Sequence, residues 1–275
     1  MAIKKYSNNE LKNKRWIKEG RGAGRNSAYK PWITVRDLSS EGRSHRIFGH
    51  KSQRTHHLLS DLELAVFLLL EWDDEVTEIR EQFPLEIEIT RAIAIDTGIS
   101  HPAVSGVQQY MSSDFLVNTT DSKRPKFVLQ AKYSEALTDY RTIEKLELER
   151  RYWNEKEVPW FIVTEIDIPK VVVKNIAWLY PAQRDEVESD VLIERTQFYA
   201  HHFNEKPNSL IVDICKTLDV AYALPTGESL FEVRLLLANR CFYFDFFIQS
   251  HKLKACDLTL ENIDCLIRAL YVSNQ

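Results

Sequence analysis

Three polar side chains near the middle of the chain have the types and the spacing of a metal-dependent catalytic site. Asp114 opens a short apolar strand at 115–117, while Gln130 and Lys132 stand at alternate positions at the end of a second strand, 127–131. Alternate residues of a strand share a face, and the start of one antiparallel strand lies beside the end of the next. We therefore expect Asp114 to lie near Gln130 and Lys132. A carboxylate, an amide oxygen and an ammonium group suit a hard cation with a base beside it.

Glu63 is a further candidate, at the start of the strongest helical pattern in the sequence, SDLELAVFLLLEW. Ser60 stands at the N-cap and Glu63 follows three residues later, which is the spacing of a capping box. Apolar residues recur along one side of this helix, which must therefore face a core. Capping alone explains Glu63. A carboxylate near a helix N-terminus that points at a sheet also suits a metal, and the two roles do not exclude each other.

The composition is that of a soluble globular protein: of 275 residues, 44% are hydrophobic and 28% are charged. The longest apolar run, at 65–70, is far too short to cross a bilayer, and the basic N-terminus lacks the apolar stretch of a signal peptide. The four cysteines show no CxxC spacing, which indicates reduced thiols and a cytoplasmic protein.

The charge is divided unevenly along the chain. Residues 1–57 hold 14 Lys and Arg against 4 Asp and Glu, while the remaining residues hold 22 against 36. A positive arm ahead of an acidic body predicts contact with a polyanion, although a solvated disordered tail explains the composition as well. Within the arm, RWIKEGRGAGR offers glycines for close backbone approach and cations for phosphates. We interpret the histidines that follow, His56 among them, as surface or DNA-facing rather than zinc-binding side chains.

The central part of the chain predicts an α/β core. Residues 76–85 alternate as a strand, 142–156 form a long helix, and 158–164 are a continuous apolar strand typical of a sheet interior. The charged side chains of that helix, Glu149 among them, are expected to form mostly a solvated face. With the hairpin and the helix before it, these elements predict a mixed sheet flanked by helices.

A domain boundary is expected at 165–170, where polar residues and a proline end the last strand. Beyond it the pattern predicts four helices and a strand, at 171–179, 186–199, 208–218, 226–239 and 241–248. Two helices with a short link, followed by a strand, are typical of a winged helix-turn-helix. Because residues 170–275 hold 11 basic against 14 acidic side chains, a protein-contact module is favoured over a DNA-binding one.

Asp114 followed by Gln130-Ala131-Lys132, with Glu63 on a preceding helix, resembles the restriction-endonuclease-like core, whose pattern is a carboxylate and then (Asp/Glu)-x-Lys. The surrounding motifs are more specific. KEGRGAGR, GRSHRI, HHLLSDLELAVFLLLEW, IREQFPL, MSSDFLV, KLELERRYW and VPWFI resemble the TnsA family, the transposon-end endonucleases of heteromeric bacterial cut-and-paste transposases. Glutamine at 130 departs from the general nuclease pattern but agrees with this narrower family. The resemblance weakens in the C-terminal third.

The resemblance implies roles for the candidate residues. Glu63 and Asp114 supply carboxylate ligands to Mg²⁺, for which Mn²⁺ is able to substitute. Gln130 adds an amide oxygen and Ala131 a backbone carbonyl. Lys132 positions or deprotonates the attacking water and offsets charge at the phosphate.

The same resemblance implies a division of the chain and a reaction. Residues 1–57 are a basic extension of the catalytic domain, 58–168 the restriction-endonuclease-like core, and 169–275 a winged-helix-like partner-binding domain. The enzyme cuts the strand that bears the 5′ end of the element, while a TnsB-type transposase cuts and joins the 3′ end. The C-terminal domain contacts TnsB or a TnsC-type ATPase. The cations expected to bind double-stranded DNA are Arg15, Lys18, Arg21, Arg25, Arg43, Arg46, Lys51 and Arg54.

Two other interpretations stay open. A stand-alone restriction enzyme or junction-resolving nuclease shares the metal site, but it cuts a defined DNA sequence or structure without TnsB. A non-catalytic DNA-binding adaptor requires Glu63, Asp114 and Lys132 to be only a helix cap and surface charges.

Overall fold

Four segments that alternate or stay apolar build one sheet in the first half of the chain. The computed structural model, which describes residues 2–37, 43–104, 106–184 and 187–260, divides the chain into two units, 1–168 and 169–275. In the first unit the strands follow the spatial order β3, β6, β7, β8. Their bounds are β3 Val76–Pro84, β6 Ser112–Thr119, β7 Lys126–Ala131 and β8 Trp160–Val163.

The sheet is mixed, as the sequence predicts. β6 pairs antiparallel with both β3 and β7, so the hairpin expected around Asp114 is confirmed. β8 pairs parallel with β7 and lies at the edge, where Phe161 keeps 43% of its surface exposed. The expectation of an interior strand is therefore wrong. An apolar run predicts that both faces of a strand are covered, but it does not tell whether another strand pairs beyond it.

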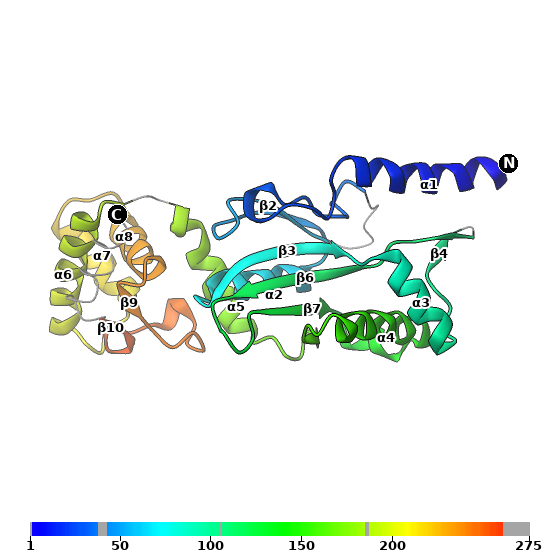
Figure 1. Cartoon of the computed structure of the whole chain (residues 1–275). Helices are drawn as coiled ribbons and strands as arrows, with labels where there is room; N and C mark the ends of the chain where they lie inside the picture. The colour runs from blue at the N-terminus through cyan, green and yellow to red at the C-terminus, as the bar shows by residue number, and fades with distance from the viewer. Residues whose placement is uncertain (1, 38–42, 105, 185–186, 261–275) are drawn as a thin grey trace. The chain divides into compact units, whose positions relative to one another are not determined.

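Helices cover both faces of this sheet (Figure 1). On one face, Leu116 and Val128 of the sheet join Trp153 of α4 and residues of α3 in a buried cluster. Phe115 points the other way, because side chains alternate along a strand, and its complete burial requires the second layer that α2 provides against β3 and β7. The helices of this unit are α1 Ala2–Lys18, α2 Asp61–Trp72, α3 Ile87–Thr97 and α4 Tyr140–Glu155.

From Trp16 onward, the described part of the N-terminal segment packs against the first unit. Trp16, Tyr29 and Trp32 are each at most 5% exposed. Its strands β1 and β2, His45–Gly49 and Arg54–Leu58, pair antiparallel with each other. Burying three large aromatic side chains is strongly favourable, so from Trp16 onward this segment belongs to the folded unit.

Two carboxylates of β3 are bound by side chains of this segment. Arg25 lies 2.7 Å from Glu78, and both Arg54 and His56 contact the completely buried Glu81. Burial alone would raise the pKa of Glu81, but the charges of His56 and Arg54 outweigh it and hold that pKa well below its usual range. His56 is itself completely buried, so the surface position expected for it is wrong. It is buried because it binds the carboxylate of Glu81, whose own burial the sequence does not reveal.

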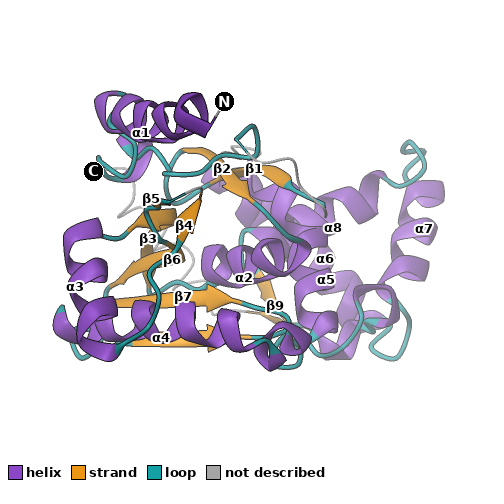
Figure 2. Cartoon of the chain, turned by 90° about the vertical axis from the view of Figure 1, so that its right-hand side faces the viewer, coloured by secondary structure: helices purple, strands orange, loops and turns teal. Residues whose placement is uncertain are grey.

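The second unit is mainly helical (Figure 2). Its described helices are α5 Lys170–Leu179, α6 Ser189–Glu205, α7 Ile211–Ala221 and α8 Glu228–Ala238. The strand expected at 241–248 is reduced to β9 Phe242–Tyr243, which pairs antiparallel with β10 Thr259–Leu260. The Asp245 carboxylate accepts a hydrogen bond from the Phe247 amide two residues later. A local turn of this kind ends the extended backbone. The expected helix at 186–199 begins at a residue outside the described ranges, which omit 185–186. The expected C-terminal domain also extends over 261–275, which lie outside the described residues.

None of the helices within the described ranges is long and apolar enough to span a bilayer.

Candidate active site

Glu63 lies in the first turn of α2, where the predicted N-cap role of Ser60 is confirmed, but the backbone bond to the Glu63 carboxylate comes from Leu59 and not from Ser60 as in a capping box. The Glu63 amide donates to Ser60 Oγ over 3.0 Å, and Ser60 Oγ donates to Glu63 Oε1 over 3.1 Å. The Leu59 amide also donates to Glu63 Oε2, over 2.9 Å. These bonds fix the carboxylate at the N-terminus of the helix, where the helix dipole favours a negative charge. Although it caps the helix, the side chain also faces the centre of the unit and is only 6% exposed.

Asp114, Gln130 and Lys132 meet at the end of the hairpin, as the strand pairing predicts. The Asp114 amide donates to Gln130 Oε1 over 3.0 Å, and the Ala131 amide donates to Asp114 Oδ2 over 2.9 Å. Lys132 Nζ lies 3.9 Å from the same carboxylate oxygen. The side-chain oxygen of Gln130 therefore already accepts one hydrogen bond from the backbone. Its second lone pair stays available to a ligand.

Gln82 joins the two carboxylates, a role that no pattern in the sequence indicates. From the middle of β3, its Nε2 donates to Asp114 Oδ1 over 3.2 Å and to Glu63 Oε2 over 3.4 Å. Its Oε1 accepts a hydrogen bond from Ser112 Oγ over 3.1 Å. The bridge brings the carboxyl groups of α2 and β6 to one amide, although they are 51 positions apart in the sequence.

Glu149 of α4 is the other residue that sequence reasoning missed. It was expected on a solvated face, yet it is 3% exposed, and that expectation is wrong. Its Oε1 accepts from Ser113 Oγ over 2.7 Å and from Trp160 Nε1 over 2.9 Å. Burial raises its pKa to about 7 against the effect of these two hydrogen bonds. The signal was its spacing, since position 149 falls three residues after Leu146 and four before Trp153, both of them buried.

The site holds more acidic groups than its single ammonium group can balance. Burial raises the pKa of Glu63 to about 8, and the neighbouring charge of Asp114 adds to the shift. The carboxylate of Asp114 raises the pKa of Lys132 against the opposing effect of burial, so this side chain stays protonated at neutral pH. A protonated lysine can orient a water molecule and offset charge at a phosphate, but it cannot accept a proton. In the metal-free site this charge state suits the first of the two roles expected for Lys132, and the choice between the roles stays a prediction.

The donor set fits Mg²⁺. Glu63 and Asp114 offer carboxylate oxygens, Gln130 an amide oxygen, and the peptide of Ala131 flanks the same place. Within the described ranges, no group of three His, Cys, Asp or Glu side chains forms a ready metal cage. Mg²⁺ in phosphate-processing sites is commonly held by one or two carboxylates and completes its shell with water and substrate phosphate. Two neighbouring carboxyl groups with an amide oxygen beside them are therefore a suitable protein contribution.

A hollow of about 420 Å³ opens beside these residues, and it is large enough for part of a nucleotide. Gln130, Lys132 and Glu149 line it on one side, and Thr142 and Lys145 of α4 line it on another. The hollow thus reaches the site at Gln130, Lys132 and Glu149, while Glu63 and Asp114 are buried and are not among its lining residues.

The structure separates the eight cations expected to bind DNA into two groups. Arg15, Lys18, Arg25, Arg43 and Arg46 are exposed, although Arg25 also binds Glu78. The other three are occupied within the fold: Arg21 binds Asp37 and the carbonyl of Trp32, Lys51 binds two backbone carbonyls, and Arg54 binds Glu81. Arg54, with 8% of its side chain exposed, is not placed to reach a phosphate, and this assignment is corrected.

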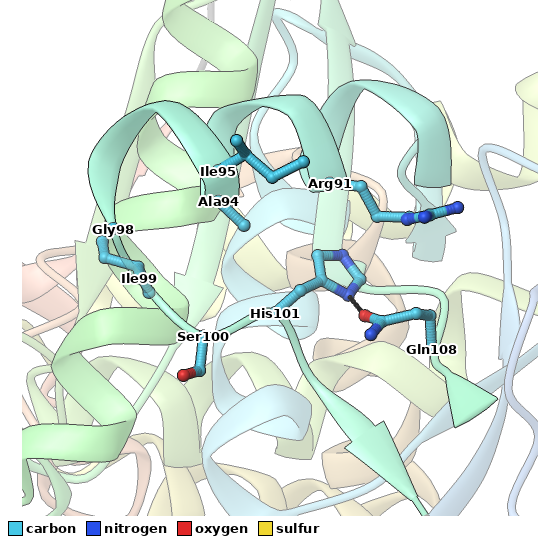
Figure 3. A pocket seen from close by; sticks show the side chains of 8 residues that line it. All are labelled: Arg91, Ala94, Ile95, Gly98, Ile99, Ser100, His101 and Gln108. Atoms are coloured by element: carbon cyan, nitrogen blue, oxygen red, sulfur yellow. Dashed lines mark hydrogen bonds between the residues drawn. The ribbon is translucent and has the colours of Figure 1, made fainter. Parts of the chain in front are cut away.

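A second hollow, of about 340 Å³, lies at α3 and the short pair β4 Ala103–Val104 and β5 Val107–Gln108 (Figure 3). Arg91 and Ile95 stand at its rim, and His101 Nδ1 lies 2.6 Å from Gln108 Oε1. Its lining includes none of the residues of the acid cluster, so it is a separate feature of the surface.

Comparisons with known proteins match both units. The family model described as TnsA-like endonuclease N terminal matches residues 73–165, and that described as TnsA endonuclease C terminal matches residues 167–246. A curated Escherichia coli protein, "Transposon Tn7 transposition protein TnsA", is 48% identical over 274 residues, which is 100% of both chains. The full-length similarity includes the segment with Glu63, which lies ahead of the first family-model match.

Proposed function

This chain belongs to the TnsA endonuclease family, and on that premise we propose that it hydrolyses DNA phosphodiester bonds at transposon 5′ ends with Mg²⁺. The observation that carries the proposal is the meeting of Glu63, Asp114 and Lys132, from three separate elements, beside one open hollow. A helix cap and scattered surface charges, as a non-catalytic adaptor requires, would not bring two carboxyl groups to one buried amide.

Glu63 and Asp114 would hold the metal in this proposal, with the Gln130 amide and the Ala131 carbonyl completing the protein's share. The bound ion would supply Lewis acidity at the phosphate and a water molecule of lowered pKa. Lys132 would orient the attacking water and reduce the repulsion between two negatively charged reactants. Water adds to phosphorus, the bond from phosphorus to the 3′ oxygen breaks, and the 3′ oxygen takes up a proton.

Glu149 is placed to act in the same reaction. Ser113 and Trp160 both bind its Oε1 and hold the carboxyl group at the wall of the hollow. With a pKa of about 7 it can exchange a proton near neutral pH. It is therefore a candidate to pass a proton to or from the reacting water.

The proposal includes partners. A relative named as a transposition protein of a transposon supports action at transposon ends, with a TnsB-type transposase cutting the other strand and a TnsC-type ATPase regulating both. The acidic balance of residues 170–275 suits protein contacts in the second unit. We place the reaction in the cytoplasm, where bacterial DNA lies, and expect little cleavage by the chain alone, since a free nuclease of this kind would damage the host genome.

The test is strand-resolved cleavage of a transposon-end duplex with TnsB present, with and without Mg²⁺. Wild type should cut the 5′ strand only with the metal. Asp114→Ala should lose at least a hundredfold in rate, about 3 kcal/mol of barrier, because too few oxygen ligands remain. Full cleavage by Asp114→Ala would support the adaptor, and cleavage of a defined sequence without TnsB would support a stand-alone nuclease.

A further inference from the structure

Gln82 is a buried residue of β3 whose backbone lies in the left-handed region. Its φ is 47° and only 2% of its surface is exposed. In this region the Cβ of any residue other than glycine comes too close to the following carbonyl oxygen, so such a residue persists only where its surroundings fix it. Strain of this kind gathers at functional sites, and Gln82 contacts two of the proposed metal ligands.

The N-terminal segment fixes this conformation. The Trp32 amide donates to the carbonyl oxygen of Gln82 over 3.1 Å, and the Tyr29 hydroxyl donates to the carbonyl of Glu81 over 3.0 Å. Trp32 is held in turn by Arg21, whose Nη1 lies 3.0 Å from its carbonyl oxygen. The carbonyl of Gln82 is thus paired with a segment outside the sheet, which accounts for its turned backbone.

The alternation of side chains between the two faces of the sheet breaks near this residue. β3 and β6 pair on both sides of Gln82 and Asp114, but these two described residues do not form a pair with each other. Ser113 and Leu116 of β6 both face α4, because Ser113 accepts a hydrogen bond from Trp153 and Leu116 packs in the cluster around the same ring. Residues three apart on a regular strand point to opposite faces, so the alternation breaks between them. The break places Ser113 on the α4 side, where its hydroxyl donates to Glu149.

The amide of Gln82 is suited to hold two acids together. Its two N–H groups serve one oxygen each of Glu63 and Asp114, and Ser112 fixes its orientation by binding the opposite end. A neutral donor reduces the repulsion between neighbouring carboxyl groups without adding a charge that would compete with a cation. Each carboxylate oxygen that accepts from Gln82 keeps a further lone pair for a metal, so the amide and a cation can be bound together.

We propose that Gln82 is a positioning residue for the metal ligands, whose left-handed backbone, held by Trp32, places its amide between Glu63 and Asp114 and sets their spacing. This inference rests on the proposed metal-dependent nuclease function and deepens it. It also gives the N-terminal segment a second role, since the segment that carries the expected DNA-binding cations shapes the metal site through Trp32. Loss of such supporting bonds commonly weakens metal binding by about 10- to 100-fold.

The experiment measures Mn²⁺ binding to the full chain by calorimetry without DNA, together with the thermal unfolding temperature. Gln82→Met keeps the length of the side chain and removes the amide. Gln53→Met is the matched control, because Gln53 also has a positive φ, of 51°, but is exposed at a turn. Gln82→Gly removes the amide and relieves the left-handed strain, and it replaces Gln82→Met if that variant does not fold.

We expect wild type and Gln53→Met to bind Mn²⁺ alike, and both Gln82 variants to bind it at least tenfold more weakly while they remain folded. Binding by either folded Gln82 variant that equals or exceeds that of wild type would overturn the inference. In that case normal Mn²⁺ binding and cleavage by wild type would leave the proposed function intact. Wild type that cleaves without any divalent metal would overturn both.

Discussion

The pKa of Glu63 leads to a prediction on how metal binding depends on pH. Burial raises this pKa to about 8, so the metal-free site keeps a proton on Glu63 at neutral pH. A carboxyl group must lose its proton before it can bind a metal. We therefore expect the apparent affinity for Mg²⁺ or Mn²⁺ to increase steadily as the pH rises from 6 to 8.

The magnitude follows from the fraction of Glu63 that is ionised. With a pKa of about 8, this fraction is about 1% at pH 6 and about one half at pH 8. The apparent affinity should then increase about 50-fold over this range, which corresponds to about 2 kcal/mol of binding free energy. Release of a proton from Glu149 would add to this gain if metal binding draws on that side chain as well.

The assay is calorimetric titration of the full chain at pH 6, 7 and 8, in two buffers of different ionisation enthalpy so that released protons are counted. Glu63→Gln should bind weakly and lose the proton release that belongs to Glu63. Glu147→Gln is the control, because Arg150 and Arg151 hold the pKa of Glu147 at about 2 and it is ionised throughout. An affinity that stays constant from pH 6 to 8, or unchanged proton release by Glu63→Gln, would refute the reasoning.

The same pKa shift determines how stability changes with pH. Below about pH 4.5 Glu63 is protonated in both the folded and the unfolded state and contributes no difference. At higher pH the unfolded chain loses this proton while the folded chain retains it up to about pH 8. Burial of Glu63 therefore makes the metal-free protein progressively less stable over this range, and metal binding should remove the effect.

Three further predictions concern the charges around the site. Lys132→Met should lower the cleavage rate at least tenfold while Mn²⁺ binds at least as tightly in calorimetry, because an ammonium group is removed from beside a carboxylate; weaker binding would contradict this. Glu149→Gln, which keeps its hydrogen bonds to neighbouring donors, should fold normally and flatten the rise of the single-turnover cleavage rate near pH 7; an unchanged profile would remove Glu149 from the proton path. Arg54→Met should leave the buried Glu81 with His56 and the His57 amide as its remaining partners and lower the free energy of unfolding in denaturant by about 3 kcal/mol, the lower end for a broken buried pair, whereas Arg46→Met at an exposed position should change it by about 0.5 kcal/mol at most.

Local signals were enough to predict the hairpin, the capped helix and the meeting of three site residues. The strand register follows from alternation and a short polar loop, and it determines that Asp114 lies beside Gln130 and Lys132. Glu63 is marked by its spacing from Ser60. Such features depend on residues within about one element of each other, so one sequence is sufficient to find them.

The remaining features depend on contacts between distant segments. Gln82 adopts a positive φ because the amide of Trp32, fifty positions earlier, donates a hydrogen bond to its carbonyl oxygen. Glu149 lies among the charges of a helix, and only the burial of that face shows that its carboxyl belongs to the site. His56 is buried because Glu81 needs a partner. In each case the conformation or burial of a polar residue is set by a contact with a distant segment, which local sequence propensity does not predict.

The position of the bound metal tests the central claim most directly. Crystals of the full chain soaked in Mn²⁺ and measured at the manganese absorption edge would locate the ion by its anomalous signal. The account predicts a peak within about 2.3 Å of a carboxylate oxygen of Glu63 and one of Asp114, which is lost in Asp114→Ala. A peak elsewhere that coincides with full cleavage activity would show that this acid pair is not the metal centre.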